Sequence, residues 1–530
     1  MKNKKLFFNI LFKSIYLEIS NKLKTIIKNK IFLISFIFII FVYIAKIILI
    51  SFTALIDDEA YYVLWTNHLP FGFFDHGAGI AYFLKLSLTI FGYNGFGVRI
   101  GSVIFSILVS VFLYKFIRNE RDENSAIISV ILFNIIPFFS GLSLIVTIDT
   151  PMFYFIIFSI MAYYKSIFYD KKYFYLSGAL IGFSILSKIN SVFIIFSILV
   201  FILFSSKRKE IFLSIEFYLS FLIIIIFCLP FIVYIIDTNF APVIYIIKRL
   251  GKSGSINGTL DFWGAQIGLF SPLFFVLFVY LIIKTAVKYI KKETSEKDFY
   301  FAFISLIPFL YILQKSFKNK LEANWALFMY AGGLFLVSFF ISQNWYKRYI
   351  RNLFFGNIIF CMTAISIIIL QYFIPIIPVK GDPTDRYFNY NAIRYDIKDY
   401  YKNSMNEDIR IFSLNYQIPS MINFYVKPEK EAVCLNWDTY HPTSFDFWYN
   451  DSNFIGNDFY YISTSENTDL ISQYFEECEY ITNFQSKRKT LNGKIRLLDN
   501  YHIFLCKNYK GRGINKNRRF KYINSFLYLY

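Results

Sequence analysis

Long apolar runs separated by short charged segments fill the chain from about residue 31 to residue 376. An α-helix needs about 20 mostly apolar residues to cross the hydrocarbon core of a bilayer, so this pattern predicts about eleven membrane-spanning helices. The predicted spans lie near residues 31–52, 97–117, 125–146, 151–169, 173–187, 190–205, 211–236, 260–283, 299–314, 323–342 and 353–376. The runs at 173–187 and 190–205 could also form one long helix with a break at "SKIN". Dividing them into two spans places the basic residues of the later loops on the same side of the membrane as the earlier ones.

The pattern changes after about residue 378. Apolar runs shorten to strand length in "DIRIFSLN", "EAVCLNW", "DFYYIST", "ECEYITNF" and "YHIFLCK", with the helical-looking pieces "QIPSMINFYV" and "NTDLISQYF" between them. Roughly 150 residues are enough for an independent core. We therefore expect a basic cytoplasmic segment over 1–30, a membrane domain over 31–378 with a first outer loop at 53–96, and a soluble α/β domain over 379–530.

Lysine and arginine residues gather at alternate ends of the predicted spans. The first 30 residues and the segments "KSIFYDKK", "SSKRKE", "KYIKKETSEK" and "WYKRYIR" fall on one side if the number of spans is odd, and the positive-inside rule makes that side cytoplasmic. The first outer loop, the loops at Asp149, 237–258 and 315–322, and the tail then lie outside. Residues 1–30 could form a basic amphipathic helix on the inner leaflet or serve only as a topology signal. We expect the first span to be a retained anchor rather than a cleaved signal peptide.

Composition supports a membrane protein and excludes several other classes. Of the 530 residues, 56% are hydrophobic, and the mean hydropathy is +0.46, which is typical of polytopic membrane proteins. The chain has no P-loop and no GxGxxG motif, so nothing supports an ATP-driven pump or a cytosolic nucleotide-sugar enzyme. We expect no nucleic acid partner.

Five cysteines are spread irregularly along the chain. They are Cys228 and Cys361 in apolar runs, and Cys434, Cys478 and Cys506 in the tail. This spacing argues against a zinc site or a disulfide framework, but it allows one bridge among the three in the tail.

Three consecutive acidic residues follow the first predicted span. Asp57, Asp58 and Glu59 repel one another beside the hydrocarbon and need a cation, a proton or a donor group nearby. A second acidic position, Asp149, stands between two apolar runs with Pro151 behind it, and it could simply cap the following helix. We expect at least one acid of the first cluster to be functional.

Two outer loops break the positive-inside pattern. Their basic residues are Lys248, Arg249 and Lys252 in "IIKRLGKSGS", and Lys315, Lys318 and Lys320 in "KSFKNKLEANW". Such groups suit a lipid-linked phosphate, which arginine binds as a fork and lysine as a point charge; contact with anionic headgroups is the alternative. Acids and bases facing one cavity suggest group transfer from a lipid phosphate donor. A carboxylate then takes a proton and cations stabilise the departing charge.

A series of longer motifs runs in order along nearly the whole chain past residue 50. They are "DDEAYYVLWTNHLPFGFFDHGAGIAYFLKL", "FGYNGFGVRIGSVIFSILVSVFLY", "IDTPMFYF", "GFSILSKINSVFIIFSILVFIL", "DFWGAQIGLFSPLFFV", "LEANWALFMY", "GDPTDRYFNYNAI", "NYQIPSMINFYV" and "SFDFWYN". Together they resemble the bacterial branch of glycosyltransferase family 39, the protein-mannosyltransferase-like group that is similar to lipid A aminoarabinose transferases. The resemblance implies a GT-C fold: many transmembrane helices, a first outer loop with interfacial helices, and a soluble C-terminal domain on the same face.

The same resemblance assigns roles to residues of the outer loops. It implies that Asp58 is the catalytic acid of the first loop, with Glu59 beside it, and that Asp149 is the second acid. Further expected substrate contacts of the first motif are Tyr62, Asp75, His76 and Lys85. The family commonly has two prolines after the histidine, whereas this chain has "HGAG", and glycines should loosen that turn.

Metal binding is left open by the sequence. Some relatives bind a divalent metal near the first outer loop, and Asp58, Asp75 and His76 are suitable ligand types. Their geometry cannot be read from spacing. We expect no other cofactor.

Together with the resemblance, these features imply an enzyme of the bacterial inner membrane whose active site and C-terminal domain face the periplasm. It would move one sugar from undecaprenyl phosphate to an extracytoplasmic acceptor, preferably a cell-envelope glycolipid such as lipid A, or another glycan. A protein hydroxyl, as in protein O-mannosyltransferases, is the alternative acceptor. The rival from another class is a lipid-linked sugar flippase or transporter, which should show inverted repeats and broken helices near mid-membrane. A purely structural envelope protein would leave the acid cluster unexplained.

Overall fold

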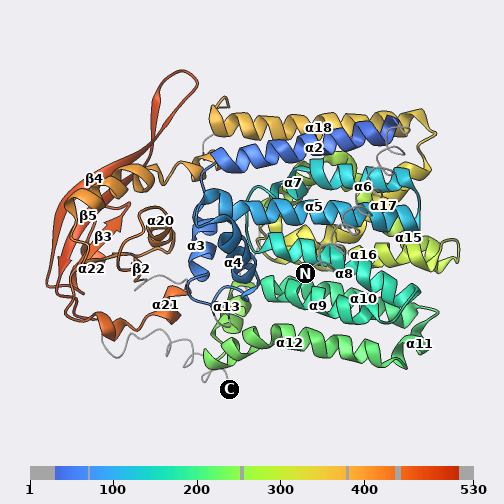
Figure 1. Cartoon of the computed structure of the whole chain (residues 1–530), viewed down its shortest axis with the longest axis horizontal. Coiled ribbons are helices and arrows are strands. Elements are labelled where there is room, and N and C mark those ends of the chain that lie inside the picture. Colours follow the sequence, from blue (N-terminus) through green and yellow to red (C-terminus); the bar gives the residue numbers. More distant parts are fainter. Residues whose placement is uncertain (1–29, 70–71, 251–255, 378–380, 436–442, 512–530) are drawn as a thin grey trace, which may run out of the picture.

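A bundle of helices carries a small sheet at one end. The computed structural model describes residues 30–69, 72–250, 256–377, 381–435 and 443–511. In Figure 1 the helices run along the long axis of the molecule, and the strands gather beyond the ends of α2 (Lys30–Phe52) and α18 (Arg348–Phe373). The basic segment predicted over 1–30 lies almost wholly outside the described residues.

The remaining helices up to the end of the bundle follow in chain order. They are α3 (Asp57–Trp65), α4 (Gly79–Phe91), α5 (Gly95–Glu120), α6 (Glu123–Ile135), α7 (Pro137–Gly141), α8 (Asp149–Phe168), α9 (Tyr173–Ser187), η1 (Ile189–Ser191), α10 (Val192–Phe204), α11 (Arg208–Phe212), α12 (Ile215–Asp237), α13 (Ala241–Leu250), α14 (Ile256–Phe270), α15 (Pro272–Ile290), α16 (Glu296–Lys318), η2 (Ala323–Tyr330) and α17 (Ala331–Gln343).

Eight helices of the described chain are long and apolar enough to cross a membrane. They are α2, α5, α8, α12, α15, α16, the continuous η2–α17 segment and α18. The shorter apolar helices α4, α6, α9 and α10 accompany them. Every predicted span overlaps one of these helices, and the total of eleven crossings stays a prediction.

Two predicted spans are interrupted in the structure. The run at 125–146 was predicted as one helix, but α6 ends at Ile135 because Pro137 lacks an amide donor and forces Ile136 into an extended conformation. The run at 260–283 is likewise divided, since Ser271 adopts a left-handed φ of 67° and α15 begins at Pro272. The "SKIN" break is present as well: α9 ends before Lys188, whose backbone is extended.

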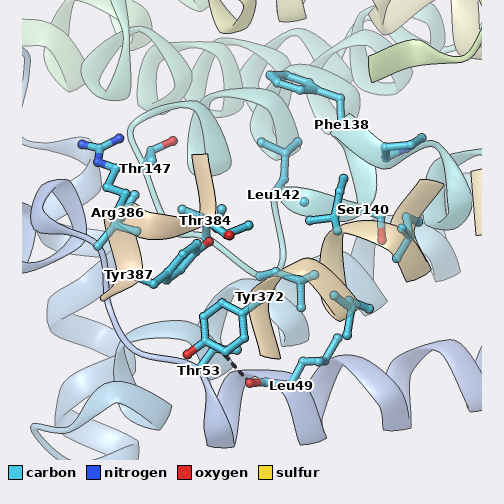
Figure 2. A pocket seen from close by; sticks show the side chains of 18 of the residues that line it. Leu49, Thr53, Phe138, Ser140, Leu142, Thr147, Tyr372, Thr384, Arg386 and Tyr387 are labelled. Carbon is cyan, nitrogen blue, oxygen red and sulfur yellow. Dashed lines mark hydrogen bonds between the residues drawn. The ribbon is translucent and has the colours of Figure 1, made fainter. Parts of the chain in front are cut away.

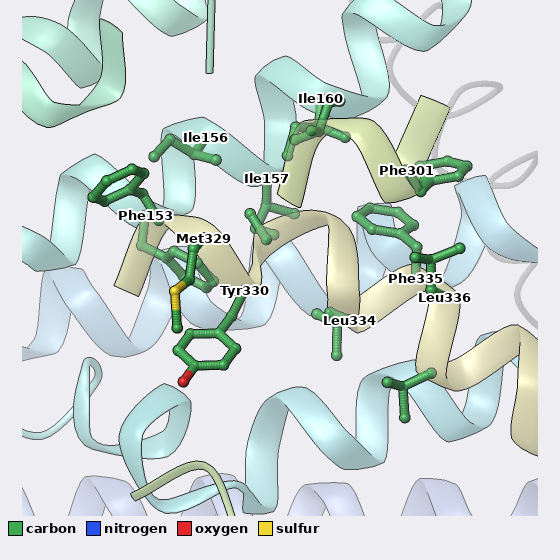
Figure 3. Packing of buried hydrophobic residues seen from close by; sticks show 14 of the residues in the cluster. Phe153, Ile156, Ile157, Ile160, Phe301, Met329, Tyr330, Leu334, Phe335 and Leu336 are labelled. Atoms are coloured by element: carbon green, nitrogen blue, oxygen red, sulfur yellow. The ribbon is translucent and has the colours of Figure 1, made fainter. Parts of the chain in front are cut away.

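The centre of the bundle is packed with aromatic and branched side chains. Figure 3 shows Phe153, Ile157 and Ile160 of α8 against Phe301 of α16 and Phe335 of α17. By contrast α2, α12, α15 and α18 leave most of their apolar surface outside the protein core. Helices that are apolar all round and peripheral are suited to contact lipid.

The chain after α18 forms one mixed sheet with short helices around it. Its strands are β1 (Arg410–Ser413), β2 (Val433–Cys434), β3 (Phe459–Ser463), β4 (Glu477–Lys489) and β5 (Ile495–Lys507), in the spatial order β2-β1-β3-β5-β4. The first three are parallel, and β3–β5 and β5–β4 are antiparallel. The helices are η3 (Pro383–Tyr387), η4 (Ile393–Ile397), α19 (Lys398–Ser404), α20 (Gln417–Tyr425), α21 (Phe445–Trp448), η5 (Asp451–Phe454) and α22 (Asp469–Ser472). Each segment predicted as a strand overlaps one of the five strands, and β4 and β5 extend well beyond the segments predicted for them.

Cysteine pairing occurs across the antiparallel end of this sheet. Cys478 of β4 and Cys506 of β5 lie opposite each other in register and form a disulfide. Cys434 is buried and unbonded. The single bridge that the sequence allowed in the tail is therefore present.

The first outer loop and the sheet share one hydrophobic core. Leu64 of α3 and Ile80 of α4 belong to the same buried cluster as Ile422 of α20 and Ile411 of β1. The helix α20 packs directly on α3. The first loop is thereby held against the C-terminal part of the chain, which positions the acids at the start of α3.

Candidate active site

A cavity of about 610 Å³ lies where the bundle meets the sheet. Its walls come from the ends of α2 and α18, from the irregular chain around α7, from the start of α8 and from η3. Figure 2 shows Leu49 and Tyr372 on one side and Phe138 and Leu142 on the other, with Arg386 at one end. Most of this lining is apolar.

The irregular wall of the cavity is the segment that the sequence predicted as the second half of a span. After Pro137 the chain makes only the short α7, and its loop is then held by hydrogen bonds to side chains. The Thr150 hydroxyl donates to the carbonyls of Leu142 and Ile145, both at 3.2 Å. Non-helical backbone at membrane depth is tolerated where it lines a cavity.

Asp58 lies at the cavity with two partners from the C-terminal part of the chain. The Arg386 guanidinium donates to its Oδ2 at 2.6 Å, and the Tyr416 hydroxyl donates to its Oδ1 at 3.1 Å. Arg386 also bonds Asp57 Oδ1 at 2.5 Å, so it bridges the two adjacent acids. The predicted need of this acid cluster for a cation is met by an arginine distant in sequence.

Asp57 is more deeply placed than Asp58. It is buried and accepts a second hydrogen bond, from Tyr390 at 3.2 Å. Burial raises the pKa of Asp57, while the positive charge of Arg386 opposes that rise. Because the same two acids surround it, the pKa of Arg386 is raised and the guanidinium stays charged.

Glu59 points away from the cavity into the protein. It is fully buried and pairs with Arg99 of α5, whose Nε donates to Glu59 Oε1 at 2.7 Å. The backbone amides of Ile56 and Val146 also donate to it, at 3.1 and 3.0 Å. Arg99 in turn bonds the carbonyl of Ala54 at 2.8 Å. This pair ties α2, α3, α5 and the cavity wall together.

Asp149 lines the cavity from the start of α8. Lys188, at the end of α9, donates to its Oδ1 at 2.7 Å, and Asn324 donates to its Oδ2 at 2.7 Å. The residue in the cap position of α8 is Ile148, so Asp149 is the first residue of the helix rather than its cap. The capping alternative therefore does not account for Asp149, which is held instead by a cation and an amide from two other segments.

Other predicted residues of the first loop lie behind α3 rather than at the cavity. Asp75 accepts a hydrogen bond from Tyr61 at 3.0 Å, and the carbonyl of His76 accepts one from the Phe73 amide at 3.1 Å. The pKa of Tyr62 is raised, first by burial and then by the charges of Asp58, Asp75 and Asp149. Tyr62 thus lies within the field of all three acids.

Among the predicted outer bases that the structure describes, Lys85, Lys315 and Lys318 do not line the cavity. Lys85 is exposed, with its Nζ 3.4 Å from the carbonyl of Thr66. Lys315 and Lys318 stand in the last turn of α16, away from the lining. Lys248 and Arg249 belong to α13, where the structure does not describe their side chains, and Lys252 lies outside the described residues.

The sequence did not indicate the two cations that bond the acids, Lys188 at Asp149 and Arg386 at Asp58. Lys188 lies in "SKIN" and Arg386 in "GDPTDRY", both inside motifs that carried the family resemblance. The available signal for Lys188 was a charge inside an otherwise apolar run, which marks a functional position by default. Arg386 lay in a polar segment with no such contrast.

The described residues by themselves do not form a site for a divalent metal. Within the described residues no group of three or more His, Cys, Asp or Glu side chains is arranged to hold one. Asp58 is paired with Arg386, and Asp75 bonds Tyr61.

Comparison with known proteins supports the fold predicted from sequence. Residues 75–234 match the family model "Dolichyl-phosphate-mannose-protein mannosyltransferase". No curated protein sequence matches the chain. The structure is similar to ArnT from Cupriavidus metallidurans in the apo state, with 9% identity, coverage of 88% of this chain and 97% of that chain, and a TM-score of 0.61.

Two further structures complete the comparison. ArnT from the same organism bound to undecaprenyl phosphate has 10% identity, coverage of 89% and 97%, and a TM-score of 0.61. The archaeal oligosaccharyltransferase AglB from Archaeoglobus fulgidus, in complex with an inhibitory peptide and a dolichol-phosphate, has 12% identity, coverage of 87% and 74%, and a TM-score of 0.48. The chain is a multi-pass membrane protein with the GT-C fold of ArnT.

Proposed function

We propose that this chain transfers a sugar from a polyprenyl phosphate, such as undecaprenyl phosphate, to an acceptor outside the cytoplasm. The observation that carries the proposal is that Asp58, Asp149 and Arg386 face one cavity whose remaining walls are largely apolar. Acids, a phosphate-binding cation and an apolar channel are the three features that a lipid-linked donor requires. The name of the matching family and the undecaprenyl phosphate bound to ArnT agree with this donor.

The apolar walls suit the isoprenoid part of the donor. Leu49 of α2 and Ile365, Ile369 and Phe373 of α18 contribute to them, and both helices expose much of their surface to the surroundings. An isoprenoid chain can therefore lie along α2 and α18 with its phosphate at Arg386. We assign no donor contact to Lys85, Lys315 or Lys318.

The chemistry then needs few groups. An acceptor hydroxyl oxygen attacks C1 of the sugar, the bond between C1 and the phosphate oxygen breaks, and the electron pair leaves with the phosphate. Arg386 stabilises the charge that develops on that phosphate. Asp58 takes the hydroxyl proton, or only positions the acceptor if the acceptor oxygen belongs to a phosphate. Asp149, fixed by Lys188 and Asn324, shapes the site.

Glu59 receives a different role from the one that the resemblance implied. Its carboxylate is enclosed by Arg99 and two backbone amides and is absent from the cavity lining. We propose that Glu59 holds the start of α3 in place and that Asp58 alone of this adjacent pair contacts substrate.

The proposed acceptor is a cell-envelope glycolipid such as lipid A, or another glycan, with a protein hydroxyl as the alternative. The proposed location is a bacterial inner membrane, with the cavity and the sheet on the periplasmic side. The Cys478–Cys506 disulfide favours an oxidising compartment for the sheet. A flippase is less favoured, because Asp58 and Asp149 stand at helix starts rather than at helix centres.

Turnover of purified protein tests the proposal. With a short-chain polyprenyl phosphate sugar and a labelled envelope glycolipid, product should form without ATP. Asp58→Asn should lower turnover by about 10²-fold or more, as loss of a general base does. The matched control is Asp469→Asn, which changes an exposed acid of α22 on the same side of the molecule.

Membrane insertion and thermal stability are measured for both variants, so that loss of fold is not mistaken for loss of chemistry. Unchanged turnover in Asp58→Asn would falsify the site assignment. Net translocation of the donor lipid without a glycosidic product would favour the flippase, and transfer to a peptide but not to the glycolipid would favour the protein acceptor.

A further inference from the structure

The β4–β5 hairpin ends in a basic and aliphatic patch that is exposed on the surface of the described part of the molecule. Lys487 pairs across the strands with Leu497, and Lys489 with Ile495, so these four side chains share one face. The hairpin patch comprises Lys487, Lys489, Leu491, Lys494, Ile495 and Leu497. Leu491, Ile495 and Leu497 are 60%, 69% and 53% exposed. Contiguous bare aliphatic surface of this kind marks an interaction site.

A well-formed turn presents the hairpin patch. The Thr490 amide donates to the Lys494 carbonyl at 2.8 Å, and the Gly493 amide donates to the Thr490 carbonyl at 2.9 Å. Gly493 has a φ of +74°, which a glycine adopts without strain in a short hairpin loop. The turn therefore holds Leu491 at its tip.

The opposite face of the hairpin is fastened to the end of a membrane helix. Arg488 is buried and donates to the carbonyls of Gln371 and Tyr372 in the last turn of α18. It also bonds Asp385 at 2.6 Å, and Arg496 pairs with the same acid. The hairpin cannot swing away from α18 without breaking these contacts.

This attachment fixes the depth of the tip. Leu491 is the third residue after Arg488, so the two are at most about 10 Å apart along the strand at about 3.3 Å per residue. The headgroup layer on each side of a bilayer is roughly 5–8 Å thick. The hairpin patch therefore lies within about 10 Å of the last turn of α18, a distance only slightly larger than the thickness of one headgroup layer.

The hairpin also reaches sideways beyond the bundle. In Figure 1 its tip rises past the edge formed by α18, over the region that lipid around the bundle would occupy. The chain that follows α18 continues an apolar border there, with Ile374, Ile376 and Ile377 exposed.

The positive charge of the hairpin patch indicates which partner it contacts. Lys487, Lys489 and Lys494 form no ion pair within the described part of the chain, unlike the two arginines on the other face. Lysines can lay their stems on apolar surface while their ammonium groups reach phosphate, and anionic headgroups attract such clusters. We propose that the hairpin patch rests on the nearest membrane leaflet, with its aliphatic side chains in the interface and its lysines on anionic phospholipid phosphates.

Fluorescence of the full-length protein in nanodiscs tests this proposal. Leu491→Cys is labelled with an environment-sensitive fluorophore, and Leu470→Cys, which is 56% exposed in α22 at the far end of the sheet, is the matched control. Lipids carrying a nitroxide near the headgroup should quench the label at position 491 and leave the label at position 470 unchanged. Quenching should be stronger with phosphatidylglycerol than with phosphatidylcholine.

The lysines are tested by the triple variant Lys487→Gln, Lys489→Gln and Lys494→Gln, which should lose the phosphatidylglycerol preference. Equal quenching at both labelled positions, or none at position 491, overturns the proposal. If the fluorescence of the label at position 491 depends on protein concentration in detergent and lipid does not quench it, the hairpin patch contacts a second copy of the chain. That result also overturns the proposal. None of these readouts requires sugar transfer.

Discussion

Asp58 and Glu59 are adjacent in the sequence, yet they face different surroundings from the same helix. Consecutive residues of an α-helix point about 100° apart, so when Asp58 faces the cavity, Glu59 turns toward α5. There it meets Arg99 in a pair with neither side chain exposed. The position of an acid within such a cluster therefore decides whether it performs chemistry or supports structure.

Glu59→Gln should reduce stability far more than Asp58→Asn does. The substitution leaves the Arg99 charge buried without its counter-ion, which typically costs about 3–5 kcal/mol of unfolding free energy. Thermal unfolding of the purified protein measures the loss. The double variant Glu59→Gln/Arg99→Gln should lose less than the sum of the single variants. A Glu59→Gln protein with unchanged stability and abolished turnover would contradict the structural role.

Sequence reasoning placed Asp58 and Asp149 at one site and missed the groups that hold them. Both acids follow or precede apolar runs, so the span pattern puts them on the same side of the membrane. Arg386 reaches Asp58 only because the chain folds back after α18, and Lys188 reaches Asp149 only because α9 stops one residue earlier. Contacts between side chains so far apart in sequence depend on packing that no local pattern encodes.

At the scale of elements, the glycines of "HGAG" act as contact points rather than as loose joints. A Cβ at Gly77 would lie 2.2 Å from the carbonyl oxygen of Leu186, and one at Gly79 would lie 2.3 Å from the Ser187 hydroxyl. The expected looseness is replaced by close packing of this turn on the end of α9. The next residue of that helix end is Lys188, so the turn supports Asp149 indirectly.

Gly77→Ala should therefore destabilise the protein by about 1–3 kcal/mol, as overpacking does, and should also lower turnover. The control is Gly264→Ala in α14, where no atom lies within 4 Å of the added Cβ and a helix interior gains from alanine. Thermal unfolding and turnover are compared for both proteins. Equal stability of the two variants would contradict the prediction, because it would show that α9 moves enough to accept a Cβ at position 77.

Element prediction from sequence succeeded where periodicity was strong and failed at the cavity wall. Long apolar runs located the helices, and short apolar runs located all five strands. The run at 125–146 looked like one span because its composition is uniformly apolar. Its second half is no longer a continuous helix after Pro137, and hydrogen bonds to the side chains of Thr150 and Glu59 hold it instead. Hydropathy does not distinguish an apolar helix from an apolar loop of this kind.

At the scale of the molecule, the orientation in the membrane can be tested directly. An impermeant thiol reagent applied to right-side-out spheroplasts should label Leu470→Cys, in α22 beside the sheet, and spare Leu213→Cys, which is 87% exposed between α11 and α12 at the opposite end. The unsubstituted chain is the background control, because Cys228 is only half-buried, whereas Cys361 and Cys434 are buried. Labelling of Leu213→Cys alone would place the cavity in the cytoplasm and exclude a periplasmic acceptor.

The core shared by the first loop and the sheet bears on how the protein is made. The α3 helix emerges early from the ribosome, whereas its partner α20 follows only after nearly the whole bundle has been synthesised. At about 5–20 residues per second, tens of seconds pass between the synthesis of α3 and that of α20. During this time the apolar face of α3 is not yet packed against α20. Catalytic competence is thus the last property that a nascent molecule acquires, and a chain that stalls late in translation inserts into the bilayer as an inert protein.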